Sequence, residues 1–140
     1  MKSEADDLVA LQRQHEEGLA HFIQPNRRER FSLLAGGRKQ RSKILFELDH
    51  FKWFDPQCCR SIANSDQTYE RILKVLYQFG APEMCWTISG RREFDARYWP
   101  LKDAVSDIWG MGNGTMISLV VGKLGYYEGE FNCRWILTKP

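Results

Sequence analysis

The chain has 140 residues, of which 43% are hydrophobic and 13% aromatic, and its formal net charge at neutral pH is only +2. This length and composition argue against extended disorder and predict one domain, residues 1–140, that can bury a core without metal or disulfide support. The small net charge removes any global electrostatic argument for a nucleic-acid or membrane partner.

The cysteines and the hydropathy pattern predict a cytoplasmic protein with no membrane partner. Residues 1–7 are acidic and lack the apolar core of a secretory signal. No apolar run approaches the roughly 20 residues that cross a bilayer. The four cysteines have no paired spacing, which is typical of reduced thiols in the cytosol.

The first predicted element is an amphipathic helix at residues 4–22, with Leu8, Leu11, His15, Leu19 and Phe22 at helical spacing. His15 lies on the apolar stripe, which favours a packed, hydrogen-bonded side chain or a partner contact over a catalytic role. The stripe is narrow, so we also consider residues 1–22 as a docking helix through which the protein self-associates.

A helical hairpin is predicted at residues 26–50, with its turn at Gly36-Gly37. Leu33 and Leu34 are expected to face inward from the first helix, and Ile44 and Leu48 from the second. Residues 26–43 have a net charge of +6, from the seven basic residues Arg27, Arg28, Arg30, Arg38, Lys39, Arg41 and Lys43 against one acidic residue. Such a segment is a solvated face, a face that pairs with the acidic first helix, or a surface that binds nucleic-acid phosphates.

The next helix is predicted to begin at a cap formed by Asn64 or Ser65 and to end before Gly80. Its expected apolar face is formed by Tyr69, Ile72, Leu73, Leu76 and Phe79. A strand at residues 84–89, a brief extended piece at 94–99 and a short helix between Pro100 and Gly110 follow.

Residues 115–138 alternate as three antiparallel strands joined by short connections. The run from Met116 to Val121 has few charges on either face, so it belongs in the middle of a sheet with cover on both sides. We therefore predict the α+β class, with N-terminal helices packed on a C-terminal, mainly antiparallel sheet of about four strands.

No catalytic residue, metal or cofactor is predicted. The glycines of residues 110–114 follow a helix and precede a strand, which is the reverse of a phosphate-binding loop, so they indicate a flexible connection. Cys58 and Cys59 are adjacent and lack the spacing of zinc ligands. Glu128 and Glu130 flank a turn beside Tyr126, and a ligand or acid–base site would require His50 and Asp55 to converge with them on one pocket.

Several segments resemble a set of small uncharacterised bacterial proteins. They are Arg28–Phe31, Asp49–Phe51, Phe79–Pro82, Gly112–Thr115, Gly122–Glu130 and Arg134–Leu137, so the likeness covers most of residues 22–138. The resemblance implies a single domain in a bacterial cytosol and carries no activity.

Three functions stay open. The preferred hypothesis is an interaction module without catalysis that binds another protein. The first alternative is a nucleic-acid accessory protein that uses the hairpin at residues 26–43. The second is a ligand binder or small enzyme with a site near Tyr126–Glu130.

Overall fold

The computed structural model describes residues 3–37, 39–63, 65 and 67–140. Within them, one antiparallel sheet has the strand order β1-β6-β5-β4-β2-β3. The strands are β1 (Cys59–Ser61), β2 (Met84–Ser89), β3 (Arg97–Pro100), β4 (Thr115–Val120), β5 (Leu124–Glu128) and β6 (Arg134–Thr138). The α-helices are α1 (Glu4–Leu19), α2 (Arg28–Gly36), α3 (Arg41–Glu47), α4 (Tyr69–Gln78) and α5 (Leu101–Ile108). The predicted α+β class is confirmed.

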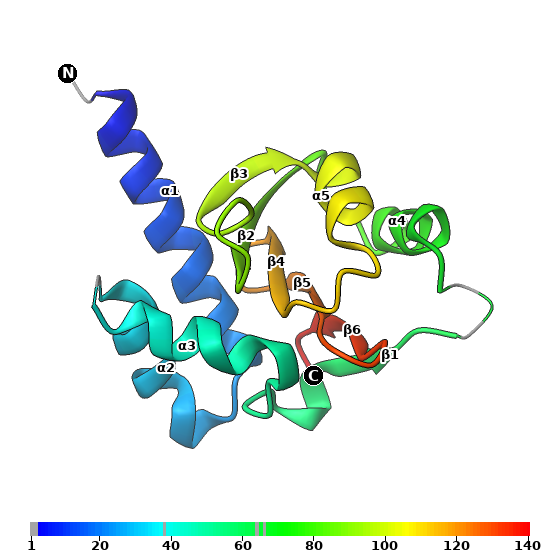
Figure 1. The fold of residues 1–140 in the computed structure, drawn as a ribbon, viewed down its shortest axis with the longest axis horizontal. Helices are drawn as coiled ribbons and strands as arrows, with labels where there is room; N and C mark the ends of the chain where they lie inside the picture. The colour runs from blue at the N-terminus through cyan, green and yellow to red at the C-terminus, as the bar shows by residue number, and fades with distance from the viewer. Residues whose placement is uncertain (1–2, 38, 64, 66) are drawn as a thin grey trace.

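The sheet lies between two helical layers (Figure 1). The N-terminal layer, α1 to α3, covers one face and packs Phe31, Ile44 and Leu48 against it. Helices α4 and α5 cover the other face, mainly through aliphatic side chains such as Ile72 and Leu76. None of the described helices combines the length and apolar character that crossing a bilayer requires.

Strand β4 lies inside the sheet, between β5 and β2, as predicted. All its residues from Thr115 to Leu119 are buried. Met116 packs into the core of the α1–α3 side, whereas Ile117 and Leu119 pack into the core of the α4–α5 side. This alternation follows from the two-residue period of an extended chain.

The predicted strand count is too low, because the sheet has six strands in the described residues. Strand β1 was missed: it has only three residues, too few to show an alternating pattern, and it pairs with β6 through Arg60 and Ile136. The expected extended piece at 94–99 begins later, at Arg97, because the chain first turns through Ala96 at φ 52°.

Helix α1 extends beyond the body of the protein (Figure 1). Ser3 caps it, because Ser3 Oγ accepts the backbone N–H of Asp6 and the Asp6 carboxylate accepts the backbone N–H of Ser3. Residues 3–10 are all exposed, whereas His15 and Leu19 are buried. The apolar stripe therefore continues past the region where the sheet covers it.

The hairpin forms as α2 and α3, with two corrections. Leu33 faces solvent, at 63% exposure, instead of the core. The second helix is shorter than expected, since α3 begins at Arg41 and the chain from Leu48 to His50 forms the 3-10 helix η3. The inward positions of Ile44 and Leu48 are confirmed.

The cap of α4 was also predicted wrongly. Thr68 Oγ1 accepts the backbone N–H of Arg71, so the helix begins at Tyr69. Ser65 lies ahead of this start, and Asn64 lies outside the described residues. Ile72 and Leu76 are buried as expected, whereas Tyr69 and Phe79 are exposed.

The glycines of residues 110–114 connect α5 to β4, as predicted. Gly110 and Gly112 have positive φ angles, 77° and 74°, that glycine adopts without strain. Gly114 is required for another reason: a Cβ there would lie 1.9 Å from the carbonyl carbon of Leu48. Glycine thus lets η3 approach the start of β4.

Candidate functional site

The basic residues of the segment 26–43 differ from one another in their surroundings in the structure. Arg28 donates from Nε to the carbonyl oxygen of Ile23 at 3.0 Å. The guanidinium of Arg27 lies over Trp53, 5.1 Å from the ring centroid. Arg30, Lys39 and Lys43 are exposed and form no ion pair within the described residues, and Arg38 lies outside those residues.

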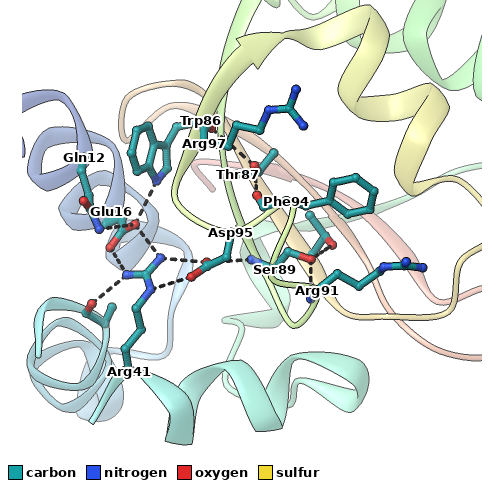
Figure 2. Close-up of polar contacts among 12 residues, drawn as sticks. Gln12, Glu16, Arg41, Trp86, Thr87, Ser89, Arg91, Phe94, Asp95 and Arg97 are labelled. Carbon is teal, nitrogen blue, oxygen red and sulfur yellow. Dashed lines mark hydrogen bonds and ion pairs between the residues drawn. The ribbon is translucent and has the colours of Figure 1, made fainter. Parts of the chain in front are cut away.

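Arg41 is the exception, because its guanidinium is enclosed between two carboxylates (Figure 2). Its terminal nitrogens donate to both oxygens of Glu16, at 2.6 and 2.9 Å. Nε and Nη2 donate to Asp95 at 3.0 and 2.9 Å, and Nη1 also donates to the carbonyl oxygen of Ala35 at 2.8 Å. These bonds use all five N–H groups of the side chain.

The two carboxylates extend this network into the rest of the fold. Glu16 also accepts the indole N–H of Trp86 at 2.9 Å and an amide N–H of Gln12 at 3.3 Å. Asp95 accepts the backbone N–H of Ser89 at 3.1 Å. The network therefore joins α1 and α3 to strand β2 and to the turn that leads into β3 (Figure 2).

Arg41 serves the fold and is not available to a ligand. Burial alone would lower the pKa of Arg41, but its hydrogen bonds to Glu16 and Asp95 outweigh burial and raise that pKa. With every donor occupied, the guanidinium has none left for a phosphate. The predicted phosphate-binding set therefore loses Arg41.

A groove lies between α2 and α3 on the outer surface of the N-terminal layer. We call it the α2–α3 groove; its volume is about 540 Å³ and its walls include Arg30, Leu34, Lys43, Phe46 and Trp53. Phe46 is 78% exposed there. A second hollow of about 360 Å³ shares Arg30, Leu34 and Lys43 with it and adds the exposed Leu33.

The groove combines apolar floor residues with a positive rim. Arg30 and Lys43 line it, and Arg27 lies above Trp53 at its edge. Glu47 is the acidic residue in its lining. An exposed aromatic side chain among cations that have no carboxylate partner in the described part of the chain suits a ligand that is both apolar and negatively charged.

His50 and Glu130, two of the predicted ligand-site residues, do meet. His50 Nδ1 lies 3.6 Å from Glu130 Oε1, and its Nε2 lies 4.0 Å from Glu47. They border an open hollow of about 440 Å³ together with Asp49 and Phe46. Both side chains are well exposed to solvent, at 50% and 40%, so water screens the pair.

The other predicted ligand-site residues lie elsewhere, so the expected convergence on one pocket is wrong. Asp55 accepts the backbone N–H of Gln57 and caps the 3-10 helix η4 (Pro56–Cys58). Glu128 is buried on the α5 side of the sheet, where Tyr126 donates to it at 2.9 Å.

Both carboxylate oxygens of Glu128 accept hydrogen bonds from structural partners. Arg134 Nε donates to its Oε1 at 2.8 Å and the backbone N–H of Gly110 to its Oε2 at 2.9 Å. Burial, reinforced by the Glu128 carboxylate, raises the pKa of Tyr126 well above its usual range. This cluster therefore holds the β5–β6 hairpin and the end of α5 together, and its Tyr126, Glu128 and Arg134 side chains are buried.

His15 is packed and hydrogen-bonded, which confirms one of the two predicted interpretations. Its Nδ1 lies 2.7 Å from Ser118 Oγ, and its ring stacks on Trp86. Burial lowers the pKa of His15. Although a serine beside a histidine is the start of a nucleophile–base pair, both side chains are buried between α1 and the sheet, so the geometry does not admit a substrate.

The four cysteines are unpaired, and the surroundings of Cys59 and Cys85 disfavour the reactive thiolate. Burial raises the pKa of Cys59 to about 11 and that of Cys85 to about 12. Within the described residues, no three histidine, cysteine or acidic side chains gather as metal ligands would.

Comparison with protein-family models, with curated proteins and with solved structures finds no match to this chain. The resemblance to uncharacterised bacterial proteins therefore stays a prediction. Sequence reasoning missed Phe46 as a surface residue, whereas Trp53 is half-buried and packs on the core. Phe46 lies outside the apolar face formed by Ile44 and Leu48, and this offset was the signal that could have revealed it.

Proposed function

We propose that this protein is an interaction module without catalysis that binds an acidic, amphipathic segment of another protein in the α2–α3 groove. The observation that carries the proposal is the 78% exposure of Phe46 beside Arg30 and Lys43, two cations without ion pairs among the described residues. The unpaired cysteines support a cytoplasmic setting, as does the resemblance to bacterial proteins.

The groove has the features of a helix-binding surface. An amphipathic helix binds by placing its apolar face in such a groove, and aromatic and arginine side chains then contribute most of the binding energy. Phe46 and Trp53 supply the aromatic contacts, and Arg30 and Lys43 would pair with carboxylates at the edges of the helix. Rim charges mainly raise the association rate and select the partner.

A peptide-display selection tests this proposal. We expect the wild-type protein to enrich amphipathic peptides in which acidic residues flank an apolar stripe. Phe46→Ser should weaken binding of the enriched peptides at least about tenfold, since an interface hot spot contributes about 2 kcal/mol or more. Lys43→Glu should reduce the association rate, measured by fluorescence polarisation in stopped flow.

Lys74→Glu on the exposed side of α4 is the matched control, and it should leave peptide binding unchanged. The proposal fails if the protein enriches no peptide, or if binding of the enriched peptides is insensitive to Phe46→Ser. Circular dichroism of each variant verifies that the fold is intact.

A second candidate function is supported by the Arg27–Trp53 stack. Single-stranded nucleic acids bind where aromatic faces are surrounded by cations, and Trp53 and Phe46 provide two such faces. Retention on single-stranded RNA across a salt series tests this alternative. It requires binding at low salt that decreases steeply with salt and is lost in Arg27→Ala/Lys43→Ala; retention that is absent at low salt rules it out.

A further inference from the structure

The first two turns of α1 form an exposed acidic helix with an apolar side. We call residues 3–10 the α1 tip. Leu8 is 49% exposed and continues the stripe that Leu19 and His15 form where the helix is buried. Glu4 and Asp7 lie in the first turn, and the tip contains no basic residue.

The α1 tip has the chemistry that the α2–α3 groove would select. Its apolar stripe with flanking carboxylates matches a groove with aromatic walls and a rim formed by Arg30 and Lys43. This match extends the proposed function, on which the inference rests. It identifies a candidate partner within the chain itself.

The tip cannot reach the groove of its own chain while α1 is intact. Helix α1 is continuous from Glu4 to Leu19, so its start lies about 24 Å along the axis from its buried end. Figure 1 shows the tip projecting away from α2 and α3. Any contact between the α1 tip and an α2–α3 groove must therefore involve two molecules.

We propose that the α2–α3 groove binds the α1 tip of a second copy of this chain, and that the exchange is reciprocal. One tip of about two turns is too small for a stable interface, which usually buries at least about 1,000 Å². A two-fold dimer forms the contact twice and closes the assembly, since each tip fills the groove of the other copy.

Sedimentation velocity over a concentration series is the first test. We expect the wild-type protein to change from the mass of one chain to that of two as concentration rises, and added salt should shift this transition to higher concentration. A single-chain mass at every concentration would overturn the inference.

The sharper test reverses the charges of the α1 tip in one variant and those of the α2–α3 groove in another. The tip variant is Glu4→Lys/Asp7→Lys, which keeps the Ser3–Asp6 capping box, and the groove variant is Arg30→Glu/Lys43→Glu. Each variant alone should lose the dimer because like charges then face each other. Mixed one to one, they should form a heterodimer in which both contacts are complementary.

Matched controls reverse charges that lie outside the proposed contact. Asp103→Lys, in the first turn of α5, and Lys74→Glu, on α4, should leave the dimer unchanged. A dimer that persists in both reversal variants would overturn the inference, because it must then use another surface.

The peptide selection separates this inference from the proposed function. If the wild-type protein is monomeric but its selected peptides still depend on Phe46, the groove binds other proteins and only the self-recognition fails. If it neither selects peptides nor dimerises, both proposals fail.

Discussion

In the described part of the chain, each side of the sheet has an arginine bonded to largely buried carboxylates, and the two clusters are built differently. On the α4–α5 side, Arg134 and Glu128 belong to the two strands of one hairpin, and their side chains are 3% and 2% exposed. On the α1–α3 side, Arg41 joins Glu16 and Asp95, which come from separate elements and lie closer to solvent.

The difference shows how each helical layer is attached. Helices α4 and α5 pack against the sheet mainly through aliphatic side chains, and the Glu128 cluster reaches this layer at the backbone of Gly110, just past the end of α5. The N-terminal layer combines its apolar core with the Arg41 network, in which five hydrogen bonds have defined directions. We infer that this network sets the position of α1 relative to α3.

The largest expected effect is that of Arg41→Met. Removing the guanidinium leaves the largely buried Glu16 and Asp95 carboxylates without their counter-charge, so the free energy of unfolding should decrease by about 3–5 kcal/mol. Urea unfolding measures the loss, and hydrogen exchange should show α1 and α3 losing protection first. Lys43→Met, two residues away and exposed, should change stability by less than about 0.5 kcal/mol.

Leu76→Ala tests the apolar attachment of the other layer. Leu76 is fully buried, so truncation should cost about 3 kcal/mol through lost burial and the cavity it leaves. Hydrogen exchange should then increase in α4 and α5 before it increases in α1. If both helical layers lose protection equally, the two layers unfold together as one cooperative unit. Lys74→Ala, on the exposed side of the same helix, is the control.

Thr68→Ala measures the cap of α4. Loss of the hydrogen bond from the Arg71 backbone to Thr68 Oγ1 should reduce the free energy of unfolding by about 1 kcal/mol. Ser65→Ala, at the position that the capping pattern predicted, should have no measurable effect. If thermal unfolding shows that Ser65→Ala is destabilising and Thr68→Ala is not, the helix is capped at the predicted position, Ser65.

The smallest expected effect is on the pH dependence of the free energy of unfolding, and it comes from His15. Burial lowers the pKa of this histidine below 6.5, so the folded state keeps it neutral while the unfolded chain takes up a proton as pH falls through 6.5. The contribution of neutral His15 to the free energy of unfolding is therefore present above pH 6.5. It is lost as the pH falls from 6.5 towards the lower pKa of the folded state. His15→Gln removes this titration, so its free energy of unfolding should decrease less on acidification. Identical pH slopes for the two proteins would contradict this assignment.

The sequence predicted the strands better than it predicted the site, for physical reasons. Alternation in β2 and β4 depends on neighbouring residues, so a local pattern reveals it. Arg41 and Lys43 are two residues apart and look equivalent in the sequence. Their difference arises from Glu16 and Asp95, which only the folded chain brings to Arg41.

Glu128 and Glu130 illustrate the same limit. They flank one predicted turn beside Tyr126, which is why they were expected in one site. Strand β5 ends at Glu128, and the turn at Gly129 directs the chain towards η3, where the Glu130 backbone N–H donates to the Asp49 carbonyl. One carboxylate is therefore buried under α5 and the other lies beside His50.

The pairing of β1 with β6 has a consequence for the order of folding. Strands β4, β5 and β6 are joined by short turns, so their hairpins can close quickly and at small entropic cost. Strand β1 instead pairs with β6 although more than half of the chain separates them in sequence, and the pairing involves only three residues of β1. We expect this edge to form after the rate-limiting step, so substitutions in β1 should accelerate unfolding and leave the refolding rate nearly unchanged.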